Sequence, residues 1–313
     1  MDVSGLTLLG VPSSAGAHHA GQDAAPAAIR ASGLIERLRD VGADVDDGGD
    51  LPGELFTVDH ANPGHRNLPA VVRMARVVAD ATERVLRAGR IPLLIGGDCT
   101  ITPGVVAGVQ RIYPEAGLAY FDGDADLATP ATTGSGVMDA MGIAHLLGIA
   151  DTELARLDGP APMLADEHLV MLGYDPGDPD SFNSGVLAAH PGVLHHPYHA
   201  LRQAPEQLAA QAVDALARCS AVVVHFDVDA VDSGDLPLGN FPHYGTGVSL
   251  TTATTVLQIL CSAPRLAAIV LTEVNPSHDP SGQQLGRYVE AVATAIGTAT
   301  GTATGTATGT AFT

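Results

Sequence analysis

Short, strongly apolar segments alternate with longer helical segments along nearly the whole of this chain of 313 residues. The apolar segments contain few polar residues, and this is typical of strands that are buried on both faces. The expected strands span residues 6–11, 43–46, 91–95, 118–121, 168–172, 221–226 and 266–272. The expected helices span residues 25–41, 67–88, 137–147, 205–219, 251–260 and 286–296. The pattern predicts one α/β domain of three layers, in which helices cover both faces of a central, mostly parallel sheet.

The last segment of the chain has a different composition. From residue 297 onward it repeats Gly, Thr and Ala, carries no charge, and has no large apolar residue before Phe312. Such a segment lacks the side chains needed to pack a core. We therefore predict a domain of residues 1–296 followed by a disordered low-complexity tail, residues 297–313.

The formal net charge of −20 restricts the possible partners. A surface this acidic disfavours nucleic acid and anionic membranes, and it favours a divalent metal ion or a small cationic substrate. The alternative is that the charge serves only solubility. The three cysteines provide no disulfide framework, and the N-terminus lacks the basic region of a signal peptide, so we expect a cytoplasmic protein.

Carboxylates follow two of the expected strands directly. One segment reads Asp122-Gly-Asp124-Ala-Asp126, and a second reads Asp227-Val-Asp229. The carboxyl ends of parallel strands meet at one edge of a sheet, where ligands bind. Five carboxylates at that edge would repel one another unless a cation compensated them. Either segment alone is compatible with helix capping, but the two together favour a metal site with oxygen ligands.

Two further strand ends carry residues with possible roles in chemistry. Cys99 follows the paired glycines of Gly96-Gly97-Asp98, and it is either a thiolate ligand or a small core residue. Glu273, in the segment Glu-Val-Asn-Pro, either binds a guanidinium group through its two oxygens or forms a structural ion pair.

Together the four segments resemble the arginase/agmatinase (ureohydrolase) family, which carries GGDH, DAHxD, DVD and EVNP in this order. Residues 21–30 and 45–50 also resemble the opening of that family, and the similarity spans residues 5–295. The resemblance implies a homo-oligomer, a trimer or a hexamer. It also implies hydrolysis of a guanidinium C–N bond by a hydroxide that two Mn²⁺ ions share.

The resemblance implies a ligand for each metal ion at positions of this sequence. One ion would be held by Cys99, Asp122, Asp126 and Asp227, and the other by Asp122, Asp124, Asp227 and Asp229. Cys99 and Asp124 stand where the family has histidines, and the resulting set is more negative than two divalent ions can balance. Either some ligands are protonated, or the number or identity of the metal differs, with Fe, Ni, Co or Zn as alternatives to Mn.

The substrate side of the family pattern is changed as well. Residues 129–136 resemble the family's substrate loop, with Ser135 in a substrate-binding position, and Asp178 matches a position that binds the substrate's amino group. Asp139 stands where the family has its acid–base histidine, and Ala128 where it has an asparagine. The candidate catalytic residues are therefore Asp124, Asp139, His145 and Glu273, with His243 as a further acid–base candidate. Residues 195–199 are expected to form an exposed loop.

Two hypotheses follow. The first is a metal-dependent hydrolase that cleaves a non-peptide C–N bond in a guanidino or amidino small molecule, such as arginine, hydroxyarginine or agmatine. The second is an impaired or repurposed member of the family, which acts as a binding or structural subunit or as another enzyme of specialised metabolism. Because two ligands and the acid–base residue differ, ordinary arginase activity is something that has to be demonstrated.

Overall fold

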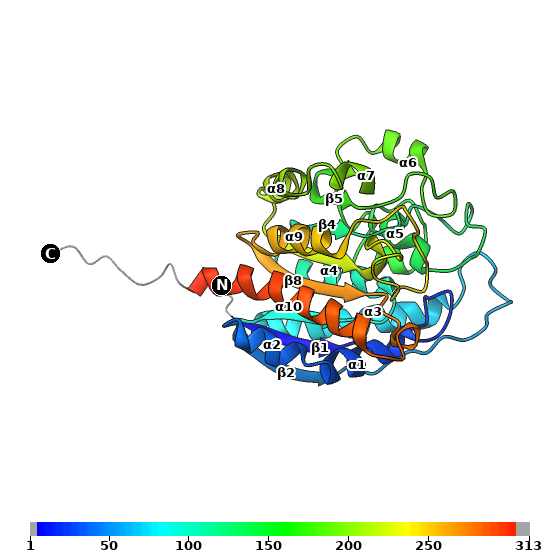
Figure 1. Ribbon diagram of the computed structural model, residues 1–313. Coiled ribbons are helices and arrows are strands. Elements are labelled where there is room, and N and C mark those ends of the chain that lie inside the picture. Colours follow the sequence, from blue (N-terminus) through cyan, green and yellow to red (C-terminus); the bar gives the residue numbers. More distant parts are fainter. Residues whose placement is uncertain (1–4, 305–313) are drawn as a thin grey trace.

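A single sheet forms the centre of the molecule in the computed structural model, which describes residues 5–304 (Figure 1). Its order is β2-β1-β3-β8-β7-β4-β5-β6, and each pair of neighbouring strands is parallel. The strands are β1 (Leu6–Gly10), β2 (Val45–Asp50), β3 (Ile91–Ile95), β4 (Ala116–Phe121), β5 (Leu169–Leu172), β6 (Leu194–His196), β7 (Ala221–Asp227) and β8 (Leu266–Thr272). The structure confirms the predicted α/β class.

Helices cover both faces of this sheet. The helices α1 (Ala25–Ala31), α2 (Leu34–Asp40), α8 (Pro205–Leu216), α9 (Leu250–Cys261) and α10 (Gln283–Thr304) contribute to the core on one face. The core on the other face includes α3 (Leu68–Arg87), α4 (Thr102–Gln110), α5 (Gly142–Leu146) and α6 (Ser184–Ala189). A further short helix, α7 (Tyr198–Leu201), follows β6. The result is the expected three-layer arrangement.

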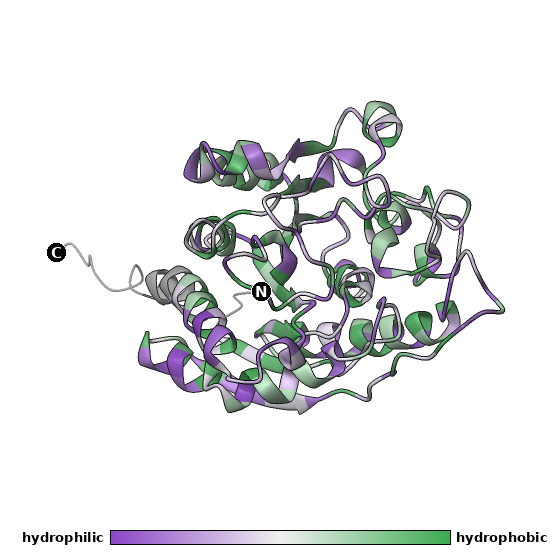
Figure 2. Cartoon of the chain, turned by 45° about the vertical axis from the view of Figure 1, so that its right-hand side comes forward, coloured by the Kyte–Doolittle hydropathy of each residue, from purple (hydrophilic) through white to green (hydrophobic). Residues whose placement is uncertain are grey.

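The two helical layers explain why the strands are apolar at every position. On β3, Leu93 and Ile95 belong to the core on the α10 side, whereas Leu94 belongs to the core under α3 and α4. On β7, Val224 belongs to the core on the α10 side and Val223 to the core under α3 and α4. In Figure 2 the hydrophilic residues gather on the outward surfaces of the helices. Within the described residues, no helix is both long and apolar enough to cross a membrane.

Two expected helices differ from the structure. The helix expected over residues 25–41 is broken at Gly33, whose φ of 82° is a left-handed conformation that favours glycine, so it forms α1 and α2. The helix expected to end at residue 296 continues to Thr304, since extending an existing helix needs no new nucleation even though Thr and Gly favour helix poorly. The rest of the predicted disordered tail, residues 305–313, lies outside the described residues.

The histidine-rich segment of residues 195–199 is not simply a loop. Leu194–His196 is the edge strand β6, which pairs with β5, and α7 begins at Tyr198. The hydroxyl of Tyr174 lies 2.7 Å from Nδ1 of His195. A short, half-buried edge strand has no apolar run, and this is why the sequence pattern did not indicate one.

Candidate metal centre

Four neighbouring strands in the middle of the sheet carry the four sequence segments. They are β3, β8, β7 and β4, in that spatial order. Phe121 of β4 is paired with Phe226 of β7, so Asp122 and Asp227 follow side by side. Segments that are far apart in the chain therefore meet at one edge because the strands that precede them are neighbours.

A cavity opens at this edge. The structure brings nearly all the predicted site residues to its wall: Cys99, Asp122, Asp124, Asp126, Ser135, Asp139, Asp178, Asp227, Asp229 and Glu273. Five further polar or aromatic residues line it that the sequence did not single out: His18, Asp180, Ser181, Asn240 and Phe241. Of the candidate catalytic and acid–base residues, His145 and His243 do not line it.

Two of the predicted site residues have left-handed backbone conformations, which are uncommon for residues other than glycine. Asp126 has a φ of 51° and Glu273 a φ of 64°. The Glu273 carboxylate is held by two hydrogen bonds, since Oε1 accepts one of 2.8 Å from the Cys99 amide and Oε2 accepts one of 2.8 Å from Nε2 of Gln22. Strained backbone that is fixed in this way is common at functional sites.

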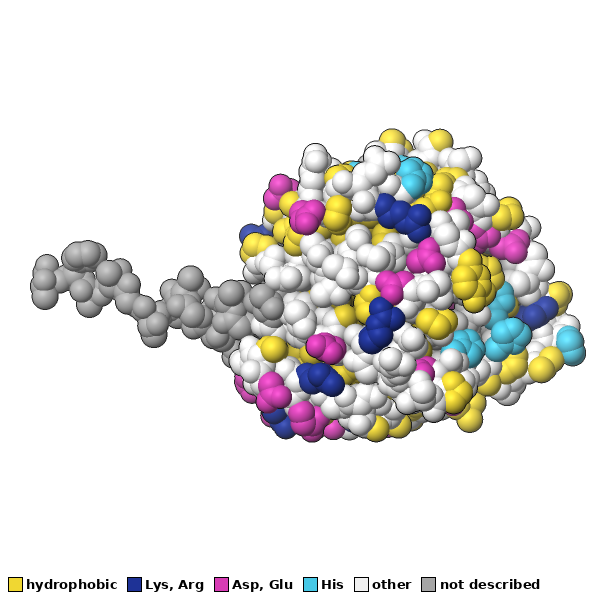
Figure 3. Space-filling model, viewed as in Figure 1, with side chains coloured by type: hydrophobic (Ala, Val, Ile, Leu, Met, Phe, Trp, Pro, Cys, Tyr) yellow, Lys and Arg dark blue, Asp and Glu magenta, His cyan; other side chains and the backbone are white. Residues whose placement is uncertain are grey.

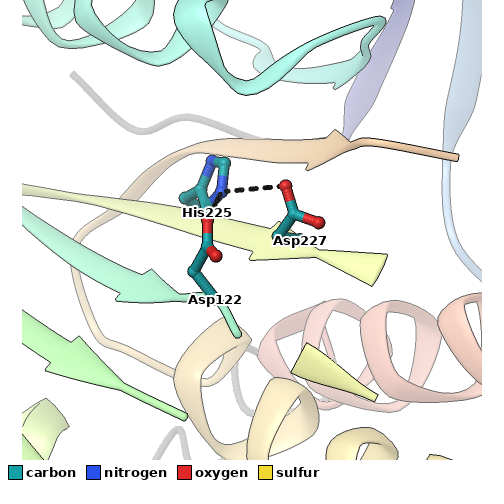
Figure 4. A group of neighbouring side chains, drawn as sticks. All are labelled: Asp122, His225 and Asp227. Carbon is teal, nitrogen blue, oxygen red and sulfur yellow. Dashed lines mark ion pairs between the residues drawn. The ribbon is translucent and has the colours of Figure 1, made fainter. Parts of the chain in front are cut away.

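Asp122 and Asp227 share a buried imidazole, that of His225 (Figure 4). Its Nε2 lies 3.4 Å from Oδ2 of Asp122 and 3.9 Å from Oδ2 of Asp227. Its Nδ1 is 2.8 Å from the hydroxyl of Thr102, and the ring stacks on Tyr120 with 4.2 Å between centroids. The three side chains place ligand atoms within 4.8 Å of one another. His225 lies two residues before Asp227, so the alternation along β7 puts both side chains on the same face.

A second group consists of Asp124, Asp229 and His243, whose ligand atoms also lie within 4.8 Å of one another. The Asp124 amide donates to Oδ1 of Asp122 over 2.7 Å, so the two groups adjoin. Burial raises the pKa of Asp124, but the imidazole of His243 lowers it by more than burial raises it, so the net pKa is below the usual value. Carboxylate oxygens and imidazole nitrogens are common ligands of divalent transition-metal ions, so both groups fit such a metal.

The carboxylates of the site lack fixed positive partners. The chain contains no lysine. In the part of the chain that the structure describes, no arginine forms an ion pair with any aspartate of the two groups or with Glu273. Burial first, and then the charge of a neighbouring aspartate, raises the pKa of Asp122 and that of Asp227 to about 7.

The same two causes raise the pKa of three more carboxyl groups well above the usual value: Asp126, Asp229 and Glu273. Without cations, protons must therefore neutralise part of the cluster at neutral pH. A metal ion that binds there would replace these protons, so the electrostatics of the site fit a cation.

Cys99 is buried, and its Sγ lies 3.3 Å from the carbonyl oxygen of Asp139 and 3.7 Å from Oδ2 of Asp126. Oδ2 of Asp126 also accepts a hydrogen bond of 2.5 Å from the hydroxyl of Tyr120. Burial, followed by the charge of Asp126, raises the pKa of the thiol well above its usual range. Cys99 is therefore a protonated hydrogen-bond donor unless a bound metal removes its proton.

Asp139 is the predicted acid–base residue that the structure places in the cavity. Its Oδ1 lies 3.6 Å from Nε2 of His18, and both residues line the wall. The segment before His18 is held by Asp98, whose Oδ2 accepts a hydrogen bond of 3.1 Å from the Gly16 amide. Asp139 and His18 therefore place two titratable side chains next to the carboxylates of the site.

The prediction of His145 as a catalytic residue is not supported by its position. The side chain is fully buried in α5, and Nδ1 lies 2.7 Å from the carbonyl oxygen of Met141, one turn earlier in the chain. Burial lowers the pKa of His145 to about 4. The helix directs this imidazole into the core, and the sequence does not show which face of so short a helix meets the cavity.

Asp178 and Ser135, the residues predicted to bind substrate, lie in the wall of the cavity. Burial, and then the neighbouring Asp124, raises the pKa of Asp178 to about 6. The hydroxyl of Ser135 accepts a hydrogen bond of 3.2 Å from the Val137 amide, which orders the loop. Phe241 and Asn240 add an apolar and an amide surface to this wall.

The fold and the site define an α/β protein with a carboxylate-rich metal centre at the carboxyl edge of its sheet. The sequence model of the arginase family matches residues 4–299. The arginase of Bacillus subtilis (strain 168) is 30% identical over 278 residues, which cover 88% of this chain and 91% of that protein. The arginase of Bacillus caldovelox is 29% identical over 280 residues, or 88% and 92% of the two chains. The chain belongs to the arginase family.

Solved structures agree with this assignment. A crystal structure of the arginase of Bacillus subtilis has a TM-score of 0.80 at 28% identity and covers 94% of this chain and 99% of that one. The proclavaminate amidino hydrolase of Streptomyces clavuligerus has a TM-score of 0.71 at 17% identity and covers 96% of this chain and 94% of that one, so it shares the fold.

Proposed function

We propose that this protein is a metal-dependent hydrolase that cleaves a C–N bond in a small, cationic guanidino or amidino compound. The observation that carries the proposal is the cavity itself, in which the five aspartates of the two acidic segments and Glu273 meet without an arginine partner in the described part of the chain. Buried carboxylates in this number need compensating charge. Metal ions and a cationic substrate together supply that charge.

The aspartates of the two groups, with Asp126, would hold one or two divalent ions, of which Mn²⁺ suits their oxygen ligands. Such ions would lower the pKa of a water molecule and so provide a nucleophile at neutral pH. Glu273 would bind the guanidinium group, because the hydrogen bonds from Cys99 and Gln22 fix its carboxylate while each oxygen retains a lone pair for a substrate N–H. Asp178 and Ser135 would contact the remainder of the substrate.

The proposal is tested by loading the metal-free protein with Mn²⁺ and measuring urea release from arginine, hydroxyarginine, agmatine and other guanidino compounds. We expect turnover of at least one of them that chelation abolishes and Mn²⁺ restores. Metal loading without turnover, combined with binding of a guanidino compound, would instead support the second hypothesis of a binding subunit. The homo-oligomer stays a prediction, which analytical ultracentrifugation tests.

The pair of His18 and Asp139 leads to a prediction on proton transfer. If it delivers the proton to the leaving amine, His18→Asn and Asp139→Asn should each lower kcat by roughly 10²–10⁴-fold, the usual contribution of general acid–base catalysis. KM should change much less, because neither substitution removes a group of the proposed guanidinium site. The exposed His199→Gln serves as the control. An unchanged kcat in both cavity variants would show that the proton comes from elsewhere.

A further inference from the structure

His243 is held firmly although it lies in the loop between β7 and α9. Its amide donates to the hydroxyl of Ser233 over 2.9 Å, and the Ser233 amide donates back to the His243 carbonyl over 2.9 Å. The imidazole packs edge-on against Phe241, with 5.6 Å between ring centroids, and the residue is only 4% exposed. The direction of the ring is therefore determined by the loop.

The imidazole is directed at the acidic turn of residues 122–126. Its Nε2 lies 3.6 Å from Oδ1 of Asp124, and neither of these buried atoms has a hydrogen-bond partner in the described part of the chain. Buried polar atoms without partners are costly. The separation is too long for a hydrogen bond and is close to the roughly 3–3.6 Å between neighbouring ligands of one ion, whose bonds measure about 2.1 Å.

Gly123 makes this approach possible. A Cβ atom at position 123 would lie 2.8 Å from Cδ2 of His243 and 2.6 Å from the carbonyl oxygen of Asp229, so no other residue fits without a shift. The Gly123 amide also donates to Oδ1 of Asp229 over 3.1 Å. The turn, Asp229 and the imidazole thus pack together as one unit.

We propose that Asp124, Asp229 and His243 form a mixed carboxylate–imidazole site for one divalent cation, in which Nε2 of His243 is a ligand. The imidazole comes from the loop before α9, whereas the acidic turn contributes a carboxylate at position 124. The charges of two aspartates and one neutral imidazole sum to −2 and balance one divalent ion. The ligand set that includes the Cys99 thiolate is too negative to be balanced in this way. The site deepens the proposed function and rests on it for the presence of a metal centre.

The experiment titrates the metal-free, full-length protein with Mn²⁺ by calorimetry and counts bound metal by elemental analysis. In His243→Leu we expect the affinity for one Mn²⁺ to fall by about 10–100-fold or more, since even groups behind the ligands contribute that much. The double variant Asp124→His/His243→Leu returns an imidazole to the same site from the opposite side, and it should regain much of the affinity. His199→Gln should bind like the wild type.

A further measurement needs no variant. Pulsed electron paramagnetic resonance of the Mn²⁺-loaded wild type should show a directly bonded imidazole nitrogen, and its absence would overturn the proposal even if His243→Leu fails to fold. Equal Mn²⁺ affinity in the wild type and in His243→Leu would overturn this proposal and leave the proposed hydrolase function standing. A wild-type protein that binds no Mn²⁺ would overturn both.

Discussion

Replacing Asp227 with asparagine is expected to abolish metal-dependent hydrolysis while leaving the metal-free fold intact. Asp227 lies at the end of β7 and belongs to the first group of ligands, beside Asp122 and two residues before Asp229 of the second group. The loss of activity should reach roughly 10³-fold or more, since losing a single electrostatic donor at a reacting group already costs about 10²–10³-fold. Urea release by the Mn²⁺-loaded variant measures this.

Although Asp227→Asn should abolish hydrolysis, it should not destabilise the protein when no metal is present. Oδ1 of Asp227 accepts a hydrogen bond of 3.0 Å from the Asp229 amide, and Oδ2 accepts one of 2.8 Å from the hydroxyl of Thr272. Asparagine keeps one acceptor, and its amide can donate to Thr272, whose hydroxyl can also accept. The variant removes one repelling carboxylate, so its melting temperature without metal at pH 8 should equal or exceed that of the wild type.

Matched measurements separate this result from misfolding. Asp232→Asn is a suitable control, because Asp232 lies in the loop that follows β7, does not line the cavity, and forms an ion pair of 3.0 Å with Arg202. It should retain hydrolysis. A large drop in the metal-free melting temperature of Asp227→Asn, or full retention of its activity, would contradict the assignment of Asp227 to the metal centre.

Much of this site is predictable from the sequence because it is built at strand ends. The apolar runs of β3, β4, β7 and β8 indicate where parallel strands stop, and the next residues must meet at one edge if those strands are neighbours. For this reason Asp122, Asp227 and Glu273 were predicted and lie together. His225 was available to the same reasoning, since it shares a strand face with Asp227, but it was not singled out.

The remaining site residues come from loops, where no periodic pattern reports position. His18 reaches the cavity because Asp98 holds the segment before it, and His243 reaches Asp124 of the acidic turn because Ser233 fixes its backbone. Both contacts join residues whose proximity depends on the folded loops. His145 shows the opposite failure, because a histidine close to the acidic segments in sequence is directed into the core by α5.

The metal-free protein is expected to lose stability as the pH rises, and Mn²⁺ is expected to restore it. The pKa values of Asp122 and Asp227 lie at about 7 in the folded protein, against 3.8 for an ordinary aspartate. Between these values the folded state binds more protons than the unfolded state, so the free energy of unfolding falls with increasing pH. The penalty is absent below about pH 4 and complete above about pH 7.

Metal binding acts in the opposite direction, because it requires the deprotonated carboxylates. One ion at about 100 times its Kd contributes about 2.7 kcal/mol. In a chain of this size that corresponds to an increase of roughly 5 °C in Tm per ion, at about 2 °C per kcal/mol. We therefore expect a large rise in Tm on adding Mn²⁺ at pH 8 and a small one at pH 5, as measured by differential scanning calorimetry.

A comparison of variants ties this pH dependence to the site. In Asp227→Asn the metal-free Tm should fall less steeply between pH 4 and pH 7, since one of the two groups with a pKa of about 7 is gone. Asp232→Asn should follow the wild type. A metal-free Tm that stays constant or rises over this interval in the wild type would mean that these carboxylates already have compensating charge. In that case the cavity would not need a cation, and the proposal of a metal centre would lose its electrostatic basis.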